Sequence, residues 1–162
     1  MLRLFFLIAV LLGSSGCANR SPLTLQWQAN KLGGVLGSQL RGTHAAGSPT
    51  LITTEGRSAA VVASRSGREN AFEKETGAVV WDSFLGFPVE APLASDNNHI
   101  FIPTLEKTIV AVRADNGKIA WQSTLSAPGY TRPTVGDGVV YVVDNRDTVF
   151  AYDTGSGGLL WG

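Results

Sequence analysis

The residues of this chain that could do chemistry are few and lie far apart in the sequence. Cys17 is the only cysteine, so it can form no internal disulfide and offers a single thiol for modification. The two histidines, His44 and His99, occupy a glycine-rich stretch and the start of a strand-like run, a spacing that builds neither a metal site nor a catalytic triad. The aspartates in turn-like segments are Asp96, Asp137, Asp144 and Asp147. These patterns predict no catalytic residue, no bound metal and no cofactor.

The N-terminal segment is predicted to direct export of the chain. Arg3 supplies a positive charge, and residues 4–12 form an uninterrupted apolar run. Such a run is too short for a membrane-spanning helix, which needs about 20 apolar residues, but it matches the core of a signal peptide. We therefore expect residues 1–16 to be a signal peptide.

Cys17 follows Ser15 and Gly16, shortly after the apolar run. This arrangement resembles the lipobox of bacterial lipoproteins, although Ser14 stands where a leucine is usual. The resemblance implies that the Cys17 thiol takes a diacylglycerol, which would hold the chain on a membrane surface without spanning it. Ala18, in place of Asp, implies sorting to the outer membrane. The alternative is an ordinary cleaved signal peptide with an incidental cysteine.

The composition limits the kinds of partner that the chain can bind. Its 162 residues carry 13 basic and 13 acidic side chains. A balanced charge creates no field that attracts nucleic acid, so we expect no nucleic-acid partner. A hydrophobic content of 44% with 19 glycines favours a folded strand-and-turn protein over a disordered one.

Three tryptophans recur forty residues apart, each with a glycine and an alanine at constant spacing before it. The three sets are Ala71, Gly77 and Trp81; Ala111, Gly117 and Trp121; and Ala151, Gly157 and Trp161. A period near forty, rich in strand-like runs, is typical of propeller blades. We predict an all-β fold, a partial β-propeller of three four-stranded blades at about 48–81, 82–121 and 122–162. In such blades the glycine permits a tight hairpin, the alanine leaves room, and the tryptophan packs on the next blade.

The region before the second blade is less regular. Residues 17–47 are predicted to hold the lipidated N-terminus, a stray blade strand around Trp27 and a glycine-rich loop near 33–47. Within the first blade, a longer inter-strand turn is predicted at 53–57. Because a closed propeller takes about 4–8 blades, three units predict a fragment of a longer chain, copies that assemble to close a ring, or an open arc. We favour the fragment.

The repeated segment resembles the tryptophan-docking motif of propellers with pyrroloquinoline-quinone-type repeats. The alanine, glycine and tryptophan hold in all three copies, and the likeness covers about residues 25–162. The motif's Asp and Thr positions vary between copies, as Glu73, Arg113 and Asp153 and as Thr76, Asn116 and Ser156.

Within that group, an exported lipoprotein without catalytic residues resembles the propeller lipoprotein of the outer-membrane β-barrel assembly machine. Leu40 and Arg41 precede a Pro-Thr pair at 49–50, as a Leu-Arg pair does on the partner-binding surface of that family. The resemblance implies that Leu40 and Arg41 bind a partner. The chain departs from the family because extra residues follow Arg41, and only Glu90 stands where paired aspartates are expected. The alternative is that Arg41 is a solvated loop residue.

The expected function is that of a non-catalytic, lipid-anchored scaffold on the periplasmic face of the outer membrane. It would mediate protein-protein interactions in the bacterial envelope during outer-membrane β-barrel protein assembly. Its expected partners are envelope proteins, including the barrel-assembly machine, the membrane through the lipid, and further copies of the chain if several complete the propeller. Two alternatives remain open: a fragment of a quinone-dependent dehydrogenase, which would need oxygen ligands for Ca²⁺, and a periplasmic ligand-sensing propeller.

Overall fold

The computed structural model describes residues 45–54 and 56–162, which form three four-stranded antiparallel sheets in chain order. The first sheet contains β1 (Ala45–Thr54), β2 (Arg57–Ser64), β3 (Arg68–Glu73) and β4 (Val79–Phe84). The second contains β5 (Ala94–Ser95), β6 (His99–Pro103), β7 (Thr108–Arg113) and β8 (Ile119–Thr124). The third contains β9 (Thr134–Gly136), β10 (Val139–Val143), β11 (Val149–Asp153) and β12 (Leu159–Trp161).

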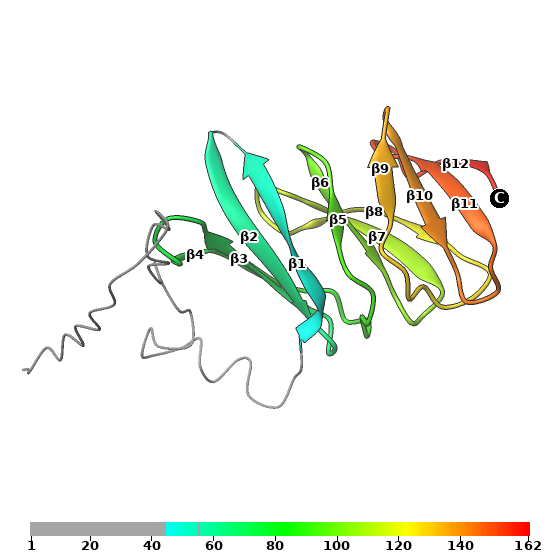
Figure 1. The fold of residues 1–162 in the computed structure, drawn as a ribbon, viewed down its shortest axis with the longest axis horizontal. Helices are drawn as coiled ribbons and strands as arrows, with labels where there is room; N and C mark the ends of the chain where they lie inside the picture. The colour runs from blue at the N-terminus through cyan, green and yellow to red at the C-terminus, as the bar shows by residue number, and fades with distance from the viewer. Residues whose placement is uncertain (1–44, 55) are drawn as a thin grey trace, which may run out of the picture.

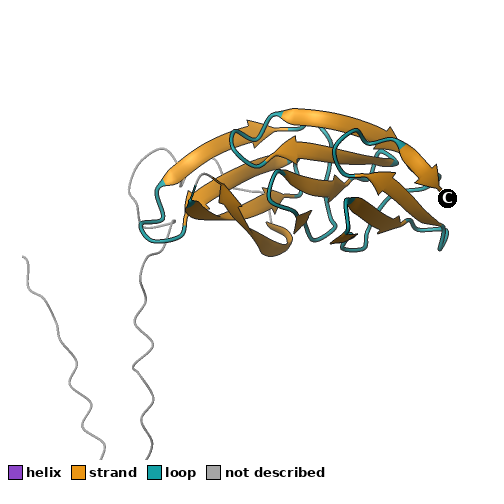
Figure 2. Ribbon diagram, turned by 90° about the horizontal axis from the view of Figure 1, so that it is seen from above, coloured by secondary structure: helices purple, strands orange, loops and turns teal. Residues whose placement is uncertain are grey.

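The sheets stand side by side along an arc, each with its strands in sequence order from one edge to the other (Figures 1 and 2). The first strand of each sheet lies next to the first strand of its neighbour, so β1, β5 and β9 form one side of the arc. We call these three the inner strands. The arrangement confirms the predicted all-β fold of three propeller blades.

Each sheet closes with the same hairpin, between its third and fourth strands. The glycine of this turn has a φ of +70° at Gly77, +69° at Gly117 and +71° at Gly157, a region that other residues rarely adopt. Its N–H donates to the carbonyl four residues before it, at 2.9 Å in all three copies.

The residue before that glycine varies in type but keeps one role. Thr76, Asn116 and Ser156 each accept a hydrogen bond through a side-chain oxygen from the backbone N–H two residues later, at 3.1, 2.9 and 3.3 Å. The variable Thr position of the sequence motif is therefore a turn position that any short side chain with an oxygen acceptor can fill.

Two of the tryptophans join neighbouring sheets. The indole N–H of Trp81 donates to the carbonyl oxygen of Ala114 at 2.9 Å, and that of Trp121 donates to Thr154 at 2.8 Å. Both acceptors lie 33 residues beyond the tryptophan, in the next sheet. The same indoles cover the turn glycines: a Cβ added to Gly117 would stand 2.5 Å from the ring of Trp81, and one at Gly157 would stand 2.5 Å from Trp121. Only glycine fits beneath the ring.

The repeated alanines lie opposite the tryptophans within each sheet. Ala71 pairs with Trp81, Ala111 with Trp121 and Ala151 with Trp161, and a bulge follows each alanine. All three alanines are fully buried. Trp161 differs from the other two tryptophans because its side chain is 54% exposed and its ring lies 6.0 Å from that of Tyr141 in the same sheet.

The long turn predicted at 53–57 is wrong. β1 continues through Thr54, which pairs with Arg57 of β2, so only two residues separate the strands. Threonine is β-branched and fits an extended, partly exposed strand, which explains why Thr53 and Thr54 prolong the ladder. The strand also begins at Ala45, inside the segment predicted as a glycine-rich loop, and a bulge between Ala46 and Thr50 accommodates the irregular start.

Candidate functional site

Several residues with predicted roles lie outside the described part of the chain. These are the lipidation candidate Cys17, the partner-binding candidates Leu40 and Arg41, and Trp27 of the stray strand. Their roles stay predictions. Within the described residues, no helix is long and apolar enough to cross a membrane, and no group of three or more His, Cys, Asp or Glu side chains could hold a metal ion.

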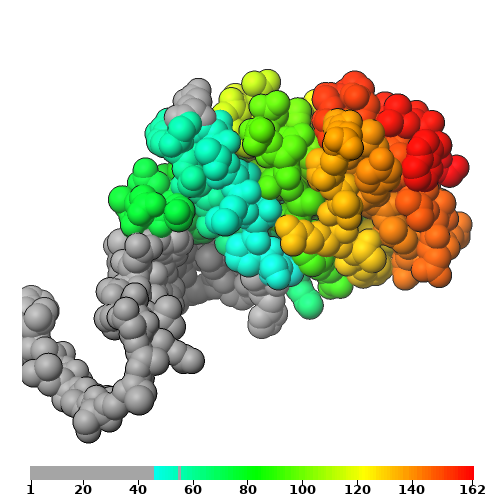
Figure 3. Space-filling view, turned by 45° about the horizontal axis from the view of Figure 1, so that its top comes forward, coloured from blue at the N-terminus to red at the C-terminus, as the bar shows by residue number. Residues whose placement is uncertain are grey.

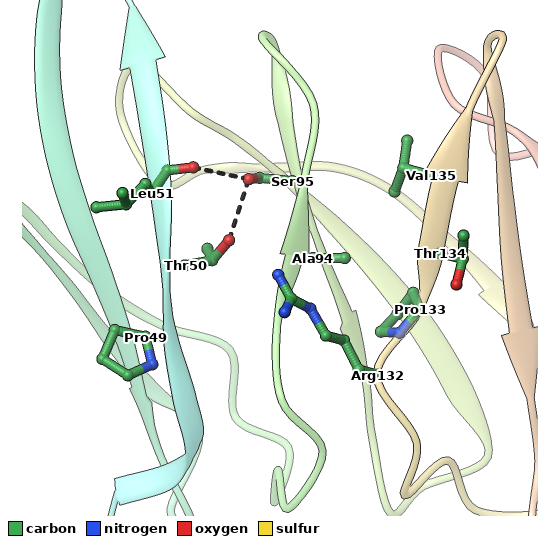
Figure 4. A pocket seen from close by; sticks show the side chains of 9 residues that line it. All are labelled: Pro49, Thr50, Leu51, Ala94, Ser95, Arg132, Pro133, Thr134 and Val135. Carbon is green, nitrogen blue, oxygen red and sulfur yellow. Dashed lines mark hydrogen bonds between the residues drawn. The ribbon is translucent and has the colours of Figure 1, made fainter.

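A groove with a volume of about 740 Å³ runs along the inner strands. We call it the inner-strand groove. In the space-filling view the surfaces of the first and third sheets flank that of the second on this side of the molecule (Figure 3). It is lined by nine residues from all three sheets: Pro49, Thr50, Leu51, Ala94, Ser95, Arg132, Pro133, Thr134 and Val135 (Figure 4).

Hydroxyl groups fix the side of the groove formed by the first two sheets. The Ser95 hydroxyl lies 3.1 Å from the Thr50 hydroxyl and donates to the carbonyl oxygen of Leu51 at 2.9 Å, which joins β5 to β1 (Figure 4). Val135 occupies the position forty residues after Ser95 and has no hydroxyl. Hydroxyl hydrogen bonds therefore join β1 to β5, and Val135 can make no such bond between β9 and β5.

Arg132 is the only charged residue among the nine. Its exposed side chain extends from the segment before β9 across the front of β5 (Figure 4). No carboxylate of the described residues forms an ion pair with it, although other arginines have such partners: Arg65 with Glu90, Arg68 with Asp82 and Arg113 with Asp115. The groove therefore presents one cation beside hydroxyl and apolar groups, a set suited to binding rather than to proton transfer or nucleophilic attack.

The sequence did carry a signal for Arg132. In the register that aligns Ser95 with Val135, the position of Arg132 holds Pro92 in the second unit. A charge at a position where the preceding unit has an apolar residue marks a site where one unit differs from another.

The aspartates serve as turn residues, as predicted. Asp96 accepts hydrogen bonds from the backbone N–H groups of Asn98 and His99, at 2.7 and 2.6 Å. Asp144 accepts from those of Arg146 and Thr148, at 2.8 and 3.2 Å. Burial acts to raise the pKa of Asp144, but these bonds and one from the Ser126 hydroxyl outweigh it and lower the pKa. The carboxylate stabilises its hairpin and is not free to act as a base.

Glu69 is an ionisable group that sequence reasoning missed. It lies in β3 and is fully buried, and neither of its carboxyl oxygens has a hydrogen-bond partner among the described residues. Desolvation raises its pKa from 4.5 to about 8, so it is mostly protonated at neutral pH. Its cross-strand neighbour Ala63 belongs to the core between the first and second sheets, which places Glu69 on that face.

Curated relatives match this chain over only part of their own length. A protein named outer membrane protein assembly factor BamB from Yersinia pestis is 26% identical over 110 residues, which is 61% of this chain and 28% of that protein. The same-named protein from Taylorella asinigenitalis is 38% identical over 82 residues, covering 50% of this chain and 21% of its own. The chain therefore spans about a quarter of the length of these relatives.

Solved structures agree with this likeness. The crystal structure of BamB from Moraxella catarrhalis aligns with a TM-score of 0.64 and 25% identity, over 72% of this chain and 37% of that one. A quinohemoprotein alcohol dehydrogenase from Pseudomonas putida shares the fold alone, with a TM-score of 0.57, 16% identity, and coverage of 68% of this chain and 20% of its own.

The family match rests on the repeats themselves. The model described as "Outer membrane protein assembly factor BamB" matches residues 65–162, more than half of the chain and most of its three sheets. The repeated docking of tryptophan on glycine lies inside the matched range. The chain belongs to the outer membrane protein assembly factor BamB family.

Proposed function

We propose that this chain acts as part of a non-catalytic propeller scaffold that holds envelope proteins together during outer-membrane protein assembly. The observation that carries the proposal is the family match over residues 65–162. The relatives from Yersinia pestis and Taylorella asinigenitalis are named for outer membrane protein assembly, which supports the bacterial envelope as the place of action.

The proposed mechanism is the presentation of loops by rigid sheets. Residues that bind a partner from loops depend on a scaffold that holds them in place, and three docked sheets supply one. Leu40 and Arg41 are the proposed contacts, since a Leu-Arg pair precedes the Pro49-Thr50 pair at the start of the first sheet. Cys17 is the proposed lipid anchor, which would keep the scaffold at the periplasmic face of the outer membrane.

Co-purification from native membranes tests the partner contact. We expect Arg41→Glu to abolish recovery of barrel-assembly partners while leaving the fold unchanged by circular dichroism, because a charge reversal in a contact repels what the arginine attracted. Arg146→Glu, which changes an exposed arginine in the β10–β11 hairpin, is the matched control and should retain the partners. Full recovery with Arg41→Glu would exclude Arg41 from the contact.

Intact mass measurement tests the anchor. The chain extracted from membranes should have the mass of a chain that begins at Cys17 plus its acyl groups, and Cys17→Ser should remove the acyl mass. A processed chain without acyl groups would contradict the lipid anchor but not the scaffold.

We further propose that the chain has no enzymatic role. The dehydrogenase likeness at 16% identity concerns the fold alone. Calcium-dependent quinone absorbance in the purified full-length chain would contradict this proposal.

A further inference from the structure

We propose that the inner-strand groove binds an extended acidic segment of a partner polypeptide, with Arg132 as its charged contact. The groove crosses the first strands of all three sheets, and its volume of about 740 Å³ lies within the range of ligand sites, about 300–1,000 Å³. A small carboxylate would contact Arg132 but would leave the β1 side empty. A segment that crosses from β9 to β1 would fill the groove.

Charge complementarity determines the chemistry of the ligand. The Arg132 guanidinium has five N–H donors in a planar fork that fits a carboxylate through two parallel hydrogen bonds. Arg132 is exposed, and no acidic side chain lines the groove or pairs with it within the described part of the chain. An Asp or Glu side chain of a partner would satisfy these donors, and a Lys would be repelled.

Hydroxyl and apolar groups beside Arg132 complete the surface. Leu51 contributes its backbone carbonyl oxygen, which accepts from Ser95; its cross-strand partner is Ala60, so its side chain lies on the face of the first sheet that points away from the second sheet. Val135 is half-buried at the β9 side. Arginine is among the residues that contribute most to binding at protein interfaces, and here it shares the groove with Val135 and the hydroxyl groups of Thr50 and Ser95.

Two prolines determine which kind of contact can bind the partner segment in the groove. Pro49 and Pro133 have no N–H, so the groove lacks backbone donors at these positions of β1 and the start of β9. Proline at an edge strand opposes pairing with an added strand. We therefore expect side chains, above all that of Arg132, to give the affinity, and not the extension of a sheet by the ligand.

Fluorescence anisotropy with the full chain tests this inference. The probe is a fluorescein-labelled peptide of alternating Glu and Val, and the comparison peptide alternates Lys and Val. We expect the Glu peptide alone to bind. Arg132→Gln should weaken it about tenfold or more, the loss expected for a charge-assisted hydrogen bond. Val135→Ser should weaken it independently of charge, and the control Arg146→Gln should bind as the unchanged chain does.

Each remaining outcome contradicts the inference. Unchanged binding by Arg132→Gln would exclude the arginine, and equal binding of the Lys peptide would exclude charge recognition. Displacement by an equal concentration of free glutamate would make the groove a small-carboxylate site. Because Arg132 is exposed, its substitution should not unfold the chain, and tryptophan fluorescence checks this. The inference is independent of the assembly function, since peptide binding can succeed where co-purification fails.

Discussion

The interface between the first and second sheets and the interface between the second and third share one docking geometry but differ in the side chains that fill them. In both, an indole N–H reaches a backbone carbonyl 33 residues ahead, and the ring covers a glycine with positive φ. The first interface is otherwise filled by small and branched aliphatic residues, such as Val61, Val110 and Val112.

The second interface is aromatic at the equivalent positions. Phe101, Phe150 and Tyr152 stand forty residues after Val61, Val110 and Val112 and pack with Trp121 in one core. The Tyr152 hydroxyl also donates to the carbonyl oxygen of Thr124 at 2.6 Å. The first interface instead contains Glu69 where the second has Ile109. The repeated residues fix the register of the sheets, and the unrepeated residues set the strength of each interface.

The largest difference should appear as a pH dependence of the first interface. Because the folded pKa of Glu69 is raised from 4.5 to about 8, its protonated form is favoured in the folded state. The stability linked to this group is fully present below pH 4.5 and is lost as pH rises to about 8. The loss in unfolding free energy should approach about 5 kcal/mol, at about 1.4 kcal/mol per pKa unit. Urea unfolding at a series of pH values measures it.

Glu69→Gln is the control for this pH dependence. The variant keeps the size and polarity of the side chain but cannot ionise, so its unfolding free energy should be nearly flat between pH 4.5 and 8. If the Gln variant loses as much stability over this range as the unchanged chain, another group is responsible.

Removing a docked tryptophan should have the next largest effect. Trp81→Ala and Trp121→Ala should each reduce the unfolding free energy by about 3–5 kcal/mol, the cost of a large-to-small change in a core. Trp121→Ala should be the more damaging because its ring also packs against Phe101, with ring centroids 5.9 Å apart. Trp161→Ala, at an exposed position, serves as the comparison and should cost less than about 1 kcal/mol.

The glycines beneath the rings should show a smaller effect. Gly117→Ala and Gly157→Ala combine an unfavourable positive φ with a Cβ 2.5 Å from a tryptophan ring, so each should cost about 1–3 kcal/mol. Gly138→Ala is a matched control because Gly138 also has a positive φ, of +77°, but a Cβ there meets no atom within 4 Å. Equal thermal stability of Gly138→Ala and Gly117→Ala would argue against the close approach of ring and glycine.

The smallest effect should come from a single side-chain hydrogen bond of the second interface, the one donated by Tyr152. Tyr152→Phe removes the hydroxyl that donates to Thr124 and should cost about 1 kcal/mol in urea unfolding. Phe150→Leu tests the packing separately. A Tyr152→Phe variant as stable as the unchanged chain would assign the strength of this interface to packing alone.

The fold was predictable because the same hairpin and tryptophan motif is repeated three times. Spacing alone identifies the hairpin glycines and the tryptophans, since each copy supports the interpretation of the others. Glu69 stands where the next two units have Ile109 and Val149, and Arg132 stands where the second unit has Pro92. Periodicity shows that such a residue differs from its counterparts in the other units. It does not show whether the strand register points the side chain toward a core or toward a groove. The long turn at 53–57 failed for a related reason: polar threonines can extend a strand.

The central claim is that tryptophan docking on the next sheet joins the blades. Hydrogen exchange of the indole N–H groups, measured by NMR in the full chain, tests this claim most directly. The N–H groups of Trp81 and Trp121 should be protected, since both donate to carbonyls of the next sheet. Trp161 should exchange nearly as fast as free indole. Raising the pH from 4.5 to 8 should reduce the protection factor of Trp81 more than that of Trp121. Exchange of Trp81 and Trp121 at the rate of Trp161 would contradict the account.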